Sequence, residues 1–479
     1  MDTINIMKKD MESNIPYPFQ NIDYKIKLLL LTAKILMENG ASTAQIKRDL
    51  YRASLFLELP EGSVDSHINY STIMLNVKVK VNMNNASANK NDADENENED
   101  VEMIDPSYSK SSFIKSKFAK RGINLSVTSL VSRLIWRATK RNYSMERYEE
   151  ELHRINHMPK HYDIKTEAIG AGLTCGGLCY LFGGDLMASI LTLFCTLIGF
   201  GAKRLCNLYR FNPYAGITIA TFSSTFMACL IYTLSWGMTS IYPIIASSIF
   251  LIPGIPLINA IDDMLSGYLI SGITRTVDTI FSIGSIALGI VLALFFFASQ
   301  AQDITSLSIK PDELSFWHAV ASSVTALGLS IMFNLPKKLL PVVAIGGMLA
   351  VDLRNILVVQ YGCSMIFGTF IGAMVVGIVG QIINHYIHTP NSLITIPSVI
   401  PLVPGVLLYR TLYAILNINT MEPNILFESM RNGIEAGIIV LSITIGITIP
   451  MIFFRPYIEN SQRREIEGLL VQRYLPKEA

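Results

Sequence analysis

The sequence predicts a polytopic α-helical membrane protein. Ten transmembrane helices form two five-helix inverted repeats, and a small N-terminal α/β cytosolic domain precedes them. Three observations predict this fold class. The 479 residues are 50% hydrophobic and only 16% charged, whereas soluble domains contain about 25% charged residues. From residue 167 onward, apolar segments of helical length follow one another. Two proline–glycine breaks, Pro253-Gly254 and Pro404-Gly405, interrupt apolar segments 151 residues apart (404 − 253).

Residues 1–165 are expected to form the cytosolic domain, which begins with two helices. Lys25 to Glu38 has helical spacing, but its apolar stretch of about ten residues is too short to cross about 30 Å of hydrocarbon. Asn39-Gly40 is expected to end this helix as a C-cap. Ser42 or Thr43 then caps a second helix, because a hydroxyl oxygen there can accept a free backbone N–H.

Two strands and two more helices complete the predicted domain. Residues 64–70 and 72–81 are expected to be strands, and the second alternates apolar with mostly polar residues. Such alternation indicates one buried face and one wet face. Helices are expected near residues 126–140 and from a cap at Ser144 to about His157.

An acidic insertion at about residues 82–116 interrupts the domain. Its segment from Asp92 to Asp105 contains eight acidic residues and few sizeable apolar ones. A segment of this composition cannot bury enough apolar surface to offset the entropy of ordering the chain. The sequence therefore predicts a disordered loop here.

The histidines before the first span have spacing found in metal sites. His153 and His157 would share a helix face, as zinc ligands do. However, Arg154 stands where a zinc protease needs a glutamate, and Pro159 takes His161 off the helix. We interpret the pattern as a solvated helix end, and the sequence predicts neither a metal nor a cofactor.

Ten apolar segments predict the membrane spans, since each approaches the roughly 20 residues that a crossing needs. A polar gap separates the fifth from the sixth. Because five is odd, two repeated halves would lie in opposite orientations. The expected division is a first half at 166–300, an extracytoplasmic linker at 301–317, a second half at 318–457 and a cytosolic tail at 458–479. The segments are 167–183, 185–203, 214–234, 240–258, 277–299, 318–334, 339–360, 364–384, 396–415 and 434–454.

Loop charges predict that both termini are cytoplasmic and that the chain lies in the inner cell membrane. Lysine and arginine concentrate in loops that this orientation places inside, with Arg410 and Arg431 as exceptions. The net charge of +1 argues against a nucleic-acid partner. The expected partners are the lipid bilayer and a small-molecule substrate, and a homo-oligomer is compatible with the sequence.

The paired breaks are the predicted binding region. Proline removes a backbone donor and forces a helix to kink or unwind, and unwound backbone at membrane depth must be buried in protein or line a cavity. Matching breaks in two apolar halves are typical of a transporter's substrate site. Asp262 and Asp263 either border such a cavity and exchange protons, or lie in headgroup water. The candidate substrate- and ion-binding residues are Pro253, Gly254, Asn259, Asp262, Asp263, Arg275, Pro404, Gly405, Tyr409 and Arg410.

Motifs of common enzymes are missing from the sequence. It contains no GxSxG elbow, no HExxH and no Gly-Lys dipeptide, so it has no P-loop. The chain is therefore expected not to be an enzyme, and ATP-driven transport by this chain alone is not expected. A carrier coupled to an ion gradient needs only a titratable group near the breaks.

Three stretches resemble the threonine/serine exporter family. They are Leu28–Gly40 followed by Ala41-Ser42-Thr43, residues 252–275 (IPGIPLINAIDDMLSGYLISGITR), and residues 396–410 (IPSVIPLVPGVLLYR). The resemblance covers most of 26–81 and 122–457, and the acidic insertion departs from it. Family members pair a cytosolic domain and one membrane half with a smaller membrane half.

The resemblance implies export of small polar amino acids such as threonine or serine, driven by a proton gradient. Separate-chain members of the family are associated with export of a dicarboxylate such as succinate. A dicarboxylate exporter is therefore an open alternative, with Arg275 or Arg410 as the carboxylate clamp. The alternative from another class is a membrane-anchored enzyme that acts through cytosolic residues 22–160.

Overall fold

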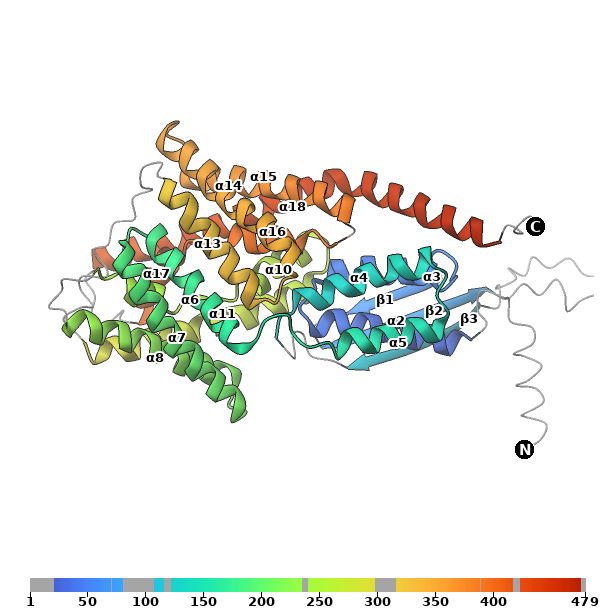
Figure 1. Ribbon diagram of the computed structural model, residues 1–479, viewed down its shortest axis with the longest axis horizontal. Coiled ribbons are helices and arrows are strands. Elements are labelled where there is room, and N and C mark those ends of the chain that lie inside the picture. The colour runs from blue at the N-terminus through green and yellow to red at the C-terminus, as the bar shows by residue number, and fades with distance from the viewer. Residues whose placement is uncertain are drawn as a thin grey trace, which may run out of the picture.

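A computed structural model describes residues 21–69, 71–80, 107–115, 122–234, 240–297, 316–387, 389–416 and 423–474. Helices dominate the described chain, and the helices of the membrane region occupy one end of its long axis (Figure 1). A small α/β domain, called the soluble domain below, occupies the other end.

The soluble domain packs helices against an antiparallel three-stranded sheet of order β1-β2-β3. Its core is formed by apolar side chains of the helices together with alternating residues of β2 such as Ile73, Leu75 and Val77, which are fully buried. The period-two burial is the pattern the sequence predicted for this strand. The elements are α2 (Ile22–Glu38), α3 (Thr43–Phe56), β1 (Val64–Ile68), β2 (Thr72–Lys80), β3 (Ser107–Lys115), α4 (Leu125–Lys140) and α5 (Met145–Asn156).

The predicted caps at the α2–α3 turn are present. Asn39 is the C-cap of α2, and Gly40 follows with a φ of 93°, a conformation that costs glycine little. Ser42 is the N-cap of α3, and its hydroxyl accepts the Gln45 backbone N–H at 3.2 Å. This choice leaves the side chain of Thr43 available for another role, described below.

The prediction of a disordered loop across residues 82–116 is wrong at its C-terminal end. Residues 107–115 form β3, which pairs with β2 from Thr72↔Lys115 to Lys80↔Ser107. The composition concealed this strand, because four of its nine residues are serines. Its Ile114 side chain packs against the core. Pairing along a buried neighbour outweighs weak intrinsic strand preference. The acidic run itself lies outside the described residues.

The first half of the membrane region contains α6 (Ile164–Leu181), α7 (Leu186–Leu208), α8 (Pro213–Leu234), α9 (Tyr242–Ala246), η4 (Ile249–Leu251), α10 (Gly254–Leu265) and α11 (Leu269–Phe295). The second half contains α13 (Phe316–Met332), η5 (Lys337–Leu339), α14 (Leu340–Val359), α15 (Met365–Ile387), α16 (Ser392–Val399), η6 (Ile400–Leu402), α17 (Gly405–Leu416) and α18 (Pro423–Tyr474).

Each of the ten predicted spans coincides with helical structure, but not all ten meet the requirements for a crossing. Within the described residues, six helices are long and apolar enough to span a membrane, or seven if the pair bent by 58° at Pro253 is one span. The six are α7, α8, α11, α14 with η5, α15 and α18. The helix α13 is shorter, and the second break divides the segment at 396–415. The count of ten therefore stays a prediction.

The two halves use the same sequence of helix contacts. In the first, α6 packs on α7, α7 on α8, α8 on α11 and α10 on α11. In the second, α13 packs on α14, α14 on α15, α15 on α18 and α17 on α18. The halves meet where α6 packs antiparallel to α13: Gly170 lies against Gly328, and Gly177 lies against Thr325. Small residues at these positions let the two backbones approach closely.

The soluble domain contacts both halves at their near ends. The backbone N–H of Leu125 donates to the carbonyl of Phe333 at 2.9 Å, and the Tyr162 hydroxyl donates to the carbonyl of Leu335 at 3.0 Å. The helix α18 contacts α4 and extends beyond the other membrane helices toward the same end of the molecule (Figure 1). These contacts place the soluble domain and the C-terminal part of α18 on one side of the membrane region.

Candidate functional site

The two proline–glycine breaks have the same backbone conformation. Each follows a short 3-10 helix, and the residue after that helix is extended: Ile252 has φ −60° and ψ 125°, and Val403 has φ −64° and ψ 128°. The N–H of Gly254 donates to the carbonyl of Ile252 at 2.8 Å, and the N–H of Gly405 donates to that of Val403 at 2.8 Å. The repeated sequence signal therefore corresponds to a repeated structure.

The breaks also face each other reciprocally. A Cβ atom on Gly254 would lie 3.1 Å from Cδ1 of Ile400, in the 3-10 helix of the second break. A Cβ atom on Gly405 would lie 3.3 Å from Cδ1 of Ile249, in the 3-10 helix of the first. Ile249 and Ile400 are separated by 151 residues (400 − 249), as are Gly254 and Gly405 (405 − 254). An exchange of equivalent contacts is the signature of a two-fold relation.

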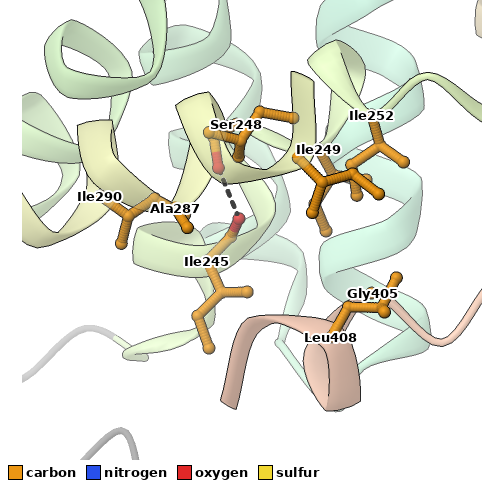
Figure 2. A pocket seen from close by; sticks show the side chains of 10 residues that line it. Ile245, Ser248, Ile249, Ile252, Ala287, Ile290, Gly405 and Leu408 are labelled. Atoms are coloured by element: carbon orange, nitrogen blue, oxygen red, sulfur yellow. Dashed lines mark hydrogen bonds between the residues drawn. The ribbon is translucent and has the colours of Figure 1, made fainter. Parts of the chain in front are cut away.

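A small apolar cavity adjoins this contact (Figure 2). Its walls include Ile249 and Ile252 from the first break, Gly405 and Leu408 from the second, and Ile290 from α11. It has about 30 Å³ of room, more than the roughly 10–15 Å³ that a cavity needs to hold one water molecule.

Asp263 has a setting that neither sequence interpretation anticipated. Its side chain is fully buried rather than exposed to water. Oδ1 accepts the backbone N–H of Thr43 at 2.9 Å, and Oδ2 accepts the Thr43 hydroxyl at 2.9 Å. The carboxylate at the end of α10 thus holds the first residue of α3 in the soluble domain.

Arg275 completes this buried cluster from α11. Its Nε lies 2.9 Å from Oδ2 of Asp263, and its Nη2 donates to the Ala41 carbonyl at 3.3 Å. Arg275 is only 2% exposed, so the ion pair is almost completely removed from water. Removing one member of such a pair is costly because the other charge remains buried without compensation.

Asn259 adds a third contact to the same turn. Its Nδ2 donates to the Gly40 carbonyl at 3.1 Å, and its side chain is buried. Asn259 and Asp263 lie four residues apart, so they share the face of α10 that the α2–α3 turn covers. We call Gly40, Ala41, Thr43, Asn259, Asp263 and Arg275 the docking cluster.

The remaining predicted residues are not part of the docking cluster. Asp262 is half-buried beside it. Arg410 of α17 is half-buried, and within the described residues its Nε and Nη2 have no hydrogen-bond partner. The Tyr409 side chain lies outside the described residues. The structure therefore brings Asn259, Asp263 and Arg275 together and separates them from the second break.

Sequence reasoning did not assign Thr43 to the site. It was considered only as a helix cap, and the cap is Ser42. The contact with Asp263 joins residues 220 positions apart, and a single sequence carries no local signal of such a pairing. The available hint was that the stretch ending at Thr43 and the stretch containing Asp263 both carried the family resemblance.

Two family models together match most of the chain. The model described as "Putative threonine/serine exporter" matches residues 27–297, and the model described as "Threonine/Serine exporter, ThrE" matches residues 318–453. The chain belongs to the threonine/serine exporter family. The two matches divide between residues 297 and 318, where the sequence predicted the boundary between halves.

Two curated relatives of the chain carry different transport names. The "Threonine/serine exporter" of Corynebacterium glutamicum is 24% identical over 321 residues, which is 63% of this chain and 63% of that protein. The "Probable succinate transporter subunit YjjP" of Escherichia coli is 26% identical over 175 residues, which is 36% of this chain and 68% of that protein. No solved structure matches the chain.

Proposed function

We propose that this member of the family is a secondary-active exporter of small polar amino acids such as threonine or serine, coupled to the proton gradient. The observation that carries the proposal is the reciprocal packing of the two breaks. Matched breaks at the interface of two halves form the substrate site in many carriers. Here the breaks touch through single isoleucine side chains, so a modest separation would open a cavity between them.

The broken helices supply groups that suit a zwitterion. The N–H groups of Ile255 in α10 and of Val406 and Leu407 in α17 lie in the first turns, where helix N–H groups lack intrahelical partners, and the helix dipole gives these ends positive character. A substrate carboxylate would bind there, and carbonyls of the extended residues would accept its ammonium hydrogens. Arg410, one and a half turns into α17, adds a half-buried cation on the second half.

The docking cluster has a different role in this proposal. Both oxygens of Asp263 already accept hydrogen bonds, and one also faces Arg275. Protonating Asp263 would leave a buried guanidinium without its counter-ion, so Asp263 is a poor proton carrier. We propose that the cluster fixes α10 and α11 to the soluble domain, so that the first break moves together with that domain.

We further propose that the two halves are inverted repeats, with the soluble domain and the chain end on the cytoplasmic side of the inner membrane. The antiparallel packing of α6 on α13 and the repeated helix contacts support the inverted relation. Reporter fusions at residue 479 and in residues 300–314 should report opposite sides. The same side for both would contradict the five-plus-five arrangement.

The direct test of the function is efflux from proteoliposomes loaded with radiolabelled threonine, serine or succinate. Efflux of threonine or serine that an imposed pH gradient accelerates is the expected result. Efflux of succinate alone would favour the dicarboxylate alternative. The name of the Escherichia coli relative supports that alternative, as do the Arg410 nitrogens that lack a partner among the described residues. Absence of efflux for all three would refute both.

A further inference from the structure

Another pocket lies between α13 and α14, and none of its lining residues belongs to the breaks or to the docking cluster. It has about 440 Å³ of room, within the range of small-molecule sites. Its walls are mostly apolar, with four polar side chains: His318 and Ser323 from α13, and Asp352 and Asn355 from α14. Placing titratable side chains in a membrane-embedded pocket costs free energy, so their presence there indicates a functional role.

The pocket lies at the end of the membrane region remote from the soluble domain. The carbonyl of Phe333, just after α13, accepts a hydrogen bond from Leu125 of the soluble domain. His318 lies 15 residues earlier on the same helix, which places it about 22 Å away along the axis at about 1.5 Å per residue. The pocket therefore belongs to the opposite side of the membrane region.

His318 is positioned to accept a proton. Its Nδ1 is buried and, within the described residues, has no hydrogen-bond partner. The ring of Tyr180 from α6 packs edge-on against it, with centroids 5.4 Å apart. A neutral imidazole carries hydrogen on one ring nitrogen and can accept a proton on the other. A histidine ring changes its charge near neutral pH more readily than other side chains.

Asp352 lines the same pocket as His318, so the pocket holds one histidine and one carboxylate. Arg354, also on α14, directs its Nε to Oδ1 of Asn355 at 3.0 Å. The elements α16 and η6 also pack on α13, and they carry no titratable side chain.

We propose that His318 and Asp352 form the proton-uptake site of the exporter, entered from the side opposite the soluble domain. The inference rests on the proposed proton-coupled export and names the residues that would serve it. A hydronium ion that enters the pocket transfers its proton to the unprotonated ring nitrogen of His318 and leaves as water. The imidazolium then pairs with the Asp352 carboxylate. Release of the proton later in the transport cycle, toward the side of the soluble domain, restores the neutral ring.

The first test compares two transport modes in proteoliposomes for the variants His318→Gln and Asp352→Asn. Both should retain counterflow, the exchange of labelled for unlabelled substrate at equal pH, and should lose the acceleration of efflux by a pH gradient. The control His157→Gln, an exposed histidine of the soluble domain, should retain both modes. Variants that keep the acceleration overturn the proposal. Variants that lose counterflow as well show that the pocket serves the substrate, which also overturns it.

A second test does not depend on any transported substrate. Nitrogen-15 spectra of the seven histidines in lipid nanodiscs identify the His318 signal by its absence in His318→Gln. That signal should move with pH between the positions of a neutral and a protonated ring, and Asp352→Asn should alter this movement. A His318 ring that stays neutral throughout, or that is indifferent to Asp352→Asn, refutes the pair even if no substrate is exported.

Discussion

Removing the Asp263 carboxylate should release the soluble domain from the first membrane half. Asp263→Asn loses the charge that faces Arg275 at 2.9 Å and weakens two hydrogen bonds from Thr43. Both charged side chains are at most 2% exposed, so the guanidinium would remain buried without a counter-ion. Breaking one side of a buried ion pair costs about 3–5 kcal/mol.

This cost can be measured locally by hydrogen exchange of the α2–α3 turn. The Thr43 amide bonds directly to Asp263, so it exchanges when the docking cluster opens. Since about 1.4 kcal/mol corresponds to a tenfold change in an equilibrium, opening should increase by a factor of about 100 or more. Thr43→Val, which removes only the hydroxyl contact, should cost about 1.5–3 kcal/mol, as for hydrogen bonds to charged groups.

Two variants separate this interpretation from general destabilisation. Asp263→Asn combined with Arg275→Met removes both charges, and it should recover much of the loss because no charge is left uncompensated. Thr274→Val changes a half-buried threonine of α11 whose hydroxyl donates to the Ile270 carbonyl within its own helix, and it should leave the turn unchanged. Unaltered exchange of the turn in Asp263→Asn would refute the docking role.

Three further predictions concern the soluble domain and its neighbours. Deleting residues 84–105 should leave insertion and transport nearly intact, because the cut ends before β3 at Ser107; loss of inserted protein would show that the acidic run is structural. A hydrogen bond from Lys27, which has the larger effect, and a hydrogen bond from Tyr24 hold the pKa of Glu149 below its usual value of 4.5. The stability that Glu149 contributes is therefore present above about pH 4.5 and is lost as pH falls through the lowered pKa. Melting temperatures measured from pH 3 to 7 should fall less at low pH in Glu149→Gln than in the unmodified protein. An identical fall in both proteins would contradict this. Asp262→Asn should retain the docked turn, as hydrogen exchange can verify.

Local chemistry made part of the fold predictable from the sequence. Proline and glycine act on their own backbone, so the residues at Pro253-Gly254 and Pro404-Gly405 were sufficient to locate the breaks. The cap at Ser42 and the turn at Gly40 are similarly local. Long apolar segments identified the membrane helices, since few other structures bury so many apolar residues in sequence.

Long-range pairing explains what the sequence could not reveal. The β3 strand exists because β2 offers it a partner, whereas its serine-rich composition suggested a loop. Asp263 and Arg275 were identified as functional candidates by their charge in an apolar region, but their partner is the turn at Gly40 to Thr43, more than 200 residues away. His318 was not singled out, because its significance depends on a pocket formed with a second helix.

The most direct test of the account asks whether the two breaks must separate during export. Ile249→Cys and Gly405→Cys would be introduced into a chain whose six native cysteines are replaced by alanine. A short bifunctional thiol reagent would then join the breaks where Ile249 and Gly405 now touch. We predict that joining abolishes threonine or serine efflux, and that cleaving a reducible bridge restores it. Full efflux through joined breaks would contradict the account.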